Sequence, residues 1–158
     1  MGHIAFKWEE STSLIDELTK PLRQVSIEFD SFGSPMAITL WRFNGTGLSI
    51  NSEMHDVAER REIGVLCFTI VSFAASPKEE LIDISSAFNA QLKAYKLIIQ
   101  ESGSSAESGI VLKSGDSELL VAPSARPYSL AIRGVLTSMP HIFEPEYQID
   151  RYECVPFI

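Results

Sequence analysis

The chain has 158 residues, of which 45% are hydrophobic and 22% charged, values typical of one globular domain. Its 13 basic and 21 acidic residues give a formal net charge of −8, spread along the whole length. This balance argues against binding to nucleic acid or anionic membranes, because both require Lys and Arg side chains. It is compatible with a basic protein partner.

Targeting and cysteine signals are weak. No stretch reaches the ~18–20 apolar residues of a membrane span, and residues 1–10 lack the pattern of a signal peptide. Cys67 and Cys154 show no metal-binding or redox spacing. We therefore expect a cytoplasmic protein with two buried, reduced thiols.

The N-terminal third predicts strands and one helix. Residues 3–8 alternate weakly, as an edge strand does, and the hydroxyl residues 11–13 precede a short apolar-periodic run, 14–18, that Pro21 would end. Alternating or β-branched stretches then predict three strands, at residues 24–30, 36–43 and 48–51. A turn at residues 32–35, which holds Gly33 and Pro35, and an Asn-Gly turn at residues 44–47 join them.

Residues 62–73 form the longest apolar stretch of the chain. Apolar side chains occur at both parities, whereas a strand with one wet face would alternate. The pattern predicts the central strand of the core, buried on both faces. We expect Val65, Cys67, Phe68 and Ile70 to be almost fully buried.

The remaining segments are less regular. The polar residues 52–61 suggest one or two helical turns, 85–92 fit either helix or strand, and the Ser- and Gly-rich residues 102–109 suggest a flexible loop. Further strands are expected at 81–84, 95–101, 110–112, 119–121, 128–135 and 147–157.

These elements predict a mainly β (β-rich α+β) fold. We expect residues 1–158 to form a single domain, an antiparallel two-sheet sandwich or flattened barrel with one or two short helices. Residues 25–73 and 95–135 follow the same strand-turn order, which raises the possibility of two similar β-meanders.

No pattern predicts a catalytic, cofactor-binding or metal site. On a helix, His55 and Glu59 would share a face at a spacing that can bind a metal, but no second ligand pair follows. A solvated, charged connector explains this stretch better. Its carboxylates, at Glu53, Asp56 and Glu59, are candidate contacts for a basic partner.

The segment 143–147 places two acids between two aromatic residues around Pro145. Extended geometry would turn Phe143 and Tyr147 toward the body of the protein, as an aromatic latch for the C-terminal strand. Glu144 and Glu146 would then be exposed and able to contact a cationic partner.

Several stretches resemble small uncharacterised bacterial proteins. These are SEMHDVAERREIGVLCF, ESGIVL, PYSL and FEPEY, and the resemblance that they carry extends over about half of the chain. No activity is assigned to that group, so the resemblance implies only a bacterial, cytosolic setting.

Three functions remain open. The first is a non-enzymatic interaction module, such as an inhibitor or immunity-type protein, which suits a small acidic domain with no catalytic motif. The second is a small-molecule binder that uses the interior of the barrel or sandwich. The third is an enzyme whose site is assembled from scattered residues.

Overall fold

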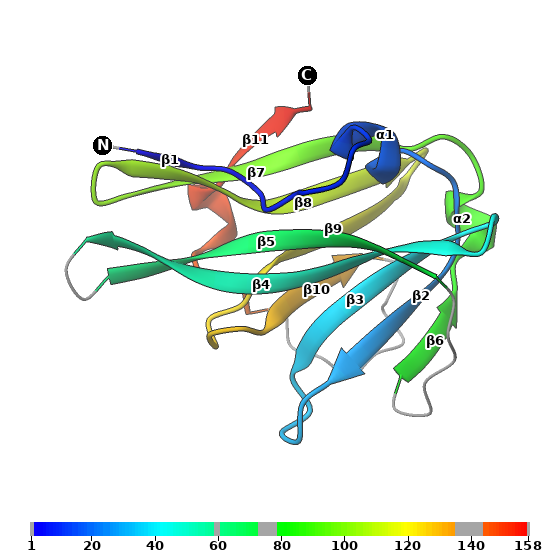
Figure 1. Ribbon diagram of the computed structural model, residues 1–158, viewed down its shortest axis with the longest axis horizontal. Helices are drawn as coiled ribbons and strands as arrows, with labels where there is room; N and C mark the ends of the chain where they lie inside the picture. Colours follow the sequence, from blue (N-terminus) through cyan, green and yellow to red (C-terminus); the bar gives the residue numbers. More distant parts are fainter. Residues whose placement is uncertain (1, 59–60, 73–78, 135–143, 158) are drawn as a thin grey trace.

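The protein is a β-sandwich (Figure 1), and the computed structural model describes residues 2–58, 61–72, 79–134 and 144–157. The first sheet has the order β5-β4-β3-β2-β6 and is antiparallel throughout. Its strands are β2 (Leu22–Phe29), β3 (Pro35–Arg42), β4 (Thr46–Ala58), β5 (Arg61–Ser72) and β6 (Glu79–Asp83).

The second sheet has the order β10-β9-β8-β7-β11, and the two-residue β1 pairs with β8 in parallel. Its strands are β1 (His3–Ile4), β7 (Lys93–Glu101), β8 (Ser104–Ser114), β9 (Ser117–Pro123), β10 (Leu130–Gly134) and β11 (Glu153–Pro156). Short helices lie at α1 (Leu14–Leu18), α2 (Ser85–Phe88) and the 3-10 turn η1 (Ile149–Arg151). The predicted fold class is therefore confirmed, and the ambiguous segment at 85 begins as a helix. No helix in these described ranges has the length and hydrophobicity needed to cross a membrane.

The core forms between the sheets because alternate residues of each strand point inward. Leu40 and Ile50 of the first sheet and Leu112 and Val121 of the second belong to one buried cluster. The side chains on the other face of the second sheet, such as Val111 and Leu120, belong to a second buried cluster. Tyr147 and Tyr152 of the C-terminal segment are part of this cluster.

Strand β5 corrects the prediction of a central strand. It is buried on both faces at Val65, Cys67 and Phe68, as expected, but it lies at the edge of its sheet, and Ile70 is only partly buried. Figure 1 shows β5 running between the rest of its own sheet and β8. Contact with the second sheet, and not a strand on each side, accounts for its burial.

The outer edge of β5 is covered by other parts of the chain. Lys7 donates its amide to Leu66 O (3.2 Å) and accepts from Phe68 N (3.0 Å). Ser108 Oγ donates to Gly64 O (2.9 Å), and Glu146 accepts from Gly64 N (2.9 and 3.1 Å). Residues 3–7, which we call the N-terminal strap, therefore connect β8 of one sheet to β5 of the other.

Two predicted irregular segments are strands. Residues 52–58 continue β4, because their backbone pairs with β5 as far as Ala58, and the expected helical turns are wrong. Residues 104–109 belong to β8, and the expected loop reduces to a tight turn at Ser102 and Gly103. Small residues are required there: a Cβ on Gly109 would lie 2.9 Å from Val121 O.

The two sheets share one strand order. In each, four consecutive strands form a meander, and the fifth strand returns to pair with the first. The meanders run from β2 to β5 and from β7 to β10, close to the ranges expected from the sequence.

Candidate functional site

The C-terminal segment 144–152 is anchored across the second sheet by its backbone. Ala125 N donates to Glu144 O (3.0 Å), and Glu146 N donates to Pro123 O (2.9 Å). Pro145 lies between these two bonds, where its lack of an amide proton removes no pairing. The segment therefore has a fixed position relative to β9 and the turn that follows it.

Two tyrosines fix the inner side of the segment. Tyr147 and Tyr152 are both 8% exposed and pack edge to face, with ring centroids 6.1 Å apart. Tyr147 N donates to Tyr152 Oη (3.3 Å), and burial raises the pKa of Tyr152 to about 12. The predicted burial of Tyr147 is thus confirmed, whereas its predicted partner Phe143 lies outside the described residues.

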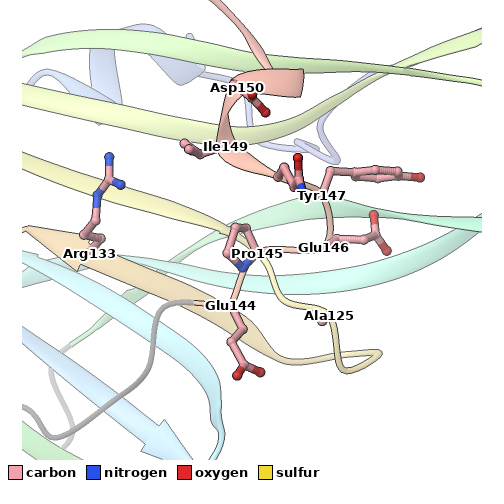
Figure 2. Close-up of a pocket in the computed structure, with 9 residues that line it drawn as sticks. Ala125, Arg133, Glu144, Pro145, Glu146, Tyr147, Ile149 and Asp150 are labelled. Carbon is pink, nitrogen blue, oxygen red and sulfur yellow. The ribbon is translucent and has the colours of Figure 1, made fainter.

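Glu146 also lies on the inner side. Figure 2 shows its side chain and that of Tyr147 extending away from Arg133. Its carboxylate binds the amide of Gly64, and burial raises its pKa although this hydrogen bond opposes the shift. Glu146 is therefore only partly exposed, contrary to the expectation, because its carboxylate covers the edge of β5. It still lines the cavity beside this segment, so its role as a partner contact stays a prediction.

The outer side of the segment borders an open groove of about 710 Å³. Pro145 and Ile149 form apolar parts of its wall, and Ile149 is 40% exposed. Glu144 and Asp150 add exposed carboxylates, and Arg133 of β10 lies opposite (Figure 2). We call this cavity the C-terminal groove.

The charges of the groove are unequal. Arg133 already pairs with Glu118 (3.9 Å). Within the described part of the chain, neither Glu144 nor Asp150 forms an ion pair within 4.0 Å. The groove therefore offers two unpaired carboxylates beside apolar surface, which suits a cationic group carried on an apolar chain.

The other predicted contact residues lie elsewhere. Glu53 pairs with Lys7 (3.2 Å), and this bond holds its pKa below the usual value. His55 lies 3.8 Å from the second oxygen of Glu53, since both side chains lie on one face of β4. Asp56 is exposed on that strand and Glu59 lies outside the described residues, so neither Glu53 nor Asp56 lines the groove.

The thiols do not form a reactive pair. Cys67 is buried, and burial together with the nearby Glu53 raises its pKa to about 12. Cys154, expected to be buried, is exposed on β11, since this short strand covers only the edge of β7. Among the described residues, no three His, Cys, Asp or Glu side chains gather in a way that could hold a metal ion.

No protein-family model, curated protein or solved structure matches the chain. The resemblance to uncharacterised bacterial proteins therefore stays a prediction. Sequence analysis located Glu144 but missed Ile149, Asp150 and Arg133. The 3-10 turn η1 brings Ile149 and Asp150 to the groove, and the position of β10 in the sheet brings Arg133 there. Neither arrangement leaves a pattern in the local sequence.

Proposed function

We propose that this protein is a non-enzymatic interaction module, of the inhibitor or immunity type, that binds a basic partner protein at the C-terminal groove. The observation that carries this proposal is the pair of unpaired carboxylates, Glu144 and Asp150, beside the exposed Ile149. A Lys or Arg side chain contributes both a cation and an apolar stem, so it complements such a surface. The net charge of −8 adds long-range attraction for a basic protein.

Fixed geometry also supports the proposal. Backbone hydrogen bonds and the two buried tyrosines hold the segment that carries Glu144 and Asp150. A partner that binds a preformed surface loses less conformational entropy than one that must order it. The groove is therefore suited to recognition without rearrangement of its wall.

A selection from a random heptapeptide library tests the proposal. We expect the peptides retained by the protein to be enriched in Lys and Arg, and their binding to weaken about tenfold or more in the variant Glu144→Gln/Asp150→Asn. Peptides without basic enrichment would overturn the proposal.

The matched control is Asp16→Asn/Glu28→Gln, which removes two exposed charges from α1 and β2. This variant has the same net charge as the groove variant. We expect it to bind the selected peptides nearly as well as the parent protein does. Equal weakening of both variants would show that binding follows overall charge and not the groove.

A small-molecule ligand is the second candidate. The groove volume of about 710 Å³ lies within the roughly 300–1,000 Å³ of ligand pockets. Charged residues at its rim favour a peptide over an apolar ligand. A thermal-shift screen of cationic amines against the parent protein and the groove variant would distinguish the two.

A further inference from the structure

A smaller cavity adjoins the C-terminal groove. It has a volume of about 200 Å³ and lies on the face of the second sheet turned away from the main core. Its apolar lining comes from three different strands, with Leu97, Val111 and Leu120, and from Tyr152. A cavity of this size is below the range of ligand pockets, and it suits a single side chain.

The two cavities are neighbours. Arg133 and Ile149 line both of them, so the smaller cavity lies beside the groove. Its far end is lined by Cys154 of β11. The surface thus combines the carboxylates of Glu144 and Asp150 with the apolar floor of the smaller cavity.

The basic residues at the rim of the smaller cavity are already paired. Lys113 lies 3.8 Å and Arg133 lies 3.9 Å from opposite oxygens of Glu118. The ammonium of Lys113 also lies 5.0 Å above the ring of Tyr95. The unpaired charge of the combined surface is therefore acidic, and it comes from Glu144 and Asp150 on either side of Pro145 and Ile149 (Figure 2).

We propose that the combined surface binds one extended segment of the basic partner. A Lys or Arg of that segment pairs with Asp150 or Glu144, and a neighbouring apolar side chain enters the smaller cavity beside Ile149. This inference rests on the proposed function and adds the apolar anchor to it. Electrostatic attraction and an apolar anchor together would specify the segment more narrowly than charge alone.

Cys154 provides a reporter for occupation of the smaller cavity. It is exposed, whereas the only other cysteine of the chain, Cys67, is buried with its pKa raised to about 12. N-ethylmaleimide should therefore modify Cys154 far faster than Cys67, because the thiolate is the reactive form. A segment seated in the cavity would shield the Cys154 thiol.

The test uses the strongest basic heptapeptide from the selection and a second peptide in which its apolar residue is replaced by serine. At saturation, we expect the first peptide to slow modification of Cys154 at least fivefold. The serine peptide should bind about tenfold more weakly, the loss expected for about two buried CH₂ groups. Because these peptides leave the protein unchanged, the result does not depend on the folding of a variant.

A protein variant gives a second readout. Ile149→Ser should weaken the first peptide more than the serine peptide, because Ile149 borders the smaller cavity as well as the groove. Its matched control is Leu81→Ser, which removes an exposed leucine (53%) from β6 of the other sheet and should leave both affinities unchanged.

The outcomes separate the two proposals. Binding that requires Glu144 and Asp150 but leaves the reactivity of Cys154 unchanged would overturn the apolar anchor and leave the proposed function intact. A selection without basic enrichment would overturn both. Shielding of Cys154 that the serine peptide reproduces would also contradict the anchor, since that peptide has no apolar side chain to insert.

Discussion

Glu146 connects the C-terminal segment to β5 through a single carboxylate. Both of its oxygens accept the amide of Gly64, a buried group at the edge of the first sheet. Without this acceptor, the amide would lose a hydrogen bond and find no replacement in the fold. The residue thus stabilises the meeting point of the two sheets.

We predict that Glu146→Ala lowers the free energy of unfolding by about 1–3 kcal/mol, because it leaves the Gly64 amide unpaired. Glu146→Gln keeps an acceptor oxygen and should change stability by less than about 1 kcal/mol at neutral pH. Urea denaturation gives the free energies, and amide exchange at Gly64 reports the bond itself. Equal stability of the Ala and Gln variants would contradict the structural role of this carboxylate.

The raised pKa of Glu146 also predicts a pH dependence. Between the ordinary carboxyl pKa and the raised value, the folded protein binds a proton that the unfolded chain has released. The contribution of Glu146 to stability is therefore fully present below the ordinary value and declines as the pH rises through the raised one. Glu146→Gln removes this titration, so denaturation curves from about pH 4 to about pH 7 should show the variant gaining relative to the parent protein.

The residues that sequence analysis placed correctly are those with a strong local signal. Tyr147 and Phe68 are large and apolar, and both are buried. Glu146 carries the same kind of side chain as Glu144, and only the approach of Gly64, 82 positions away, gives it a different role. A contact between such distant residues leaves no local pattern.

At the scale of the element, β5 shows why an apolar pattern is ambiguous. Side chains at both parities indicate burial on both faces, but they do not show which neighbour provides it. Strands of a sheet cover an edge by hydrogen bonds, whereas a packed sheet covers a face. Here β4 pairs with one edge of β5, and the second sheet covers much of its surface. The burial of β5 was therefore predictable from the sequence, whereas its position in the strand order was not.

Phe68 tests the contribution of β5 to the core. Its ring is 4% exposed and packs edge to face on Phe6 of the N-terminal strap, with centroids 5.2 Å apart. We predict that Phe68→Ala lowers the free energy of unfolding by roughly 3–5 kcal/mol. The neighbouring, exposed Thr69 provides a control, and Thr69→Ala should cost less than about 0.5 kcal/mol. A loss below about 1 kcal/mol for Phe68→Ala in denaturant melts would show that the strap and β5 are not jointly packed.

Residues 104–109 were mistaken for a loop for a related reason. Ser and Gly usually indicate turns. In β8 the same small side chains allow β5 to approach, as the bond from Ser108 Oγ to Gly64 O shows. Small residues therefore marked a close contact between sheets, which the local sequence does not distinguish from flexibility.

At the scale of the whole molecule, the basic residues are largely neutralised. Arg42 is 4% exposed and pairs with Glu17 (3.3 Å). Arg61 pairs with Glu101 (3.0 Å), and Lys96 pairs with Glu107 (2.6 Å). A basic patch would have to be built from Arg42, Arg60, Arg61, Lys93 and Lys96. The three paired residues cannot supply its unpaired charge, Lys93 is exposed on β7, and Arg60 lies outside the described residues.

We therefore predict no binding to DNA, RNA or anionic vesicles at physiological salt. Gel-shift and vesicle-sedimentation assays at low micromolar protein check this, with a basic protein of similar size as the positive control. A shift that weakens as the salt concentration rises would contradict the prediction, because such a dependence requires phosphates neutralised by Lys or Arg.

The repeated strand order was partly visible in the sequence, since the turns that delimit each meander carry Gly, Pro or Asn. The return of β6 to β2 and of β11 to β7 was not, because neither short strand has a distinctive composition. An internal duplication stays a prediction that rests on this shared order.

The covered edge of β5 has a consequence for the order in which the chain is synthesised. The ribosome completes the first sheet while β8 and Glu146, two of the three parts that cover this edge, are still unmade. Until they emerge, the nascent sheet presents unpaired backbone groups to neighbouring chains, and such edges seed aggregation. We therefore expect expression at low temperature, or with abundant ribosome-associated chaperones, to raise the yield of folded protein. Substitutions on the surface of the folded protein should raise it less.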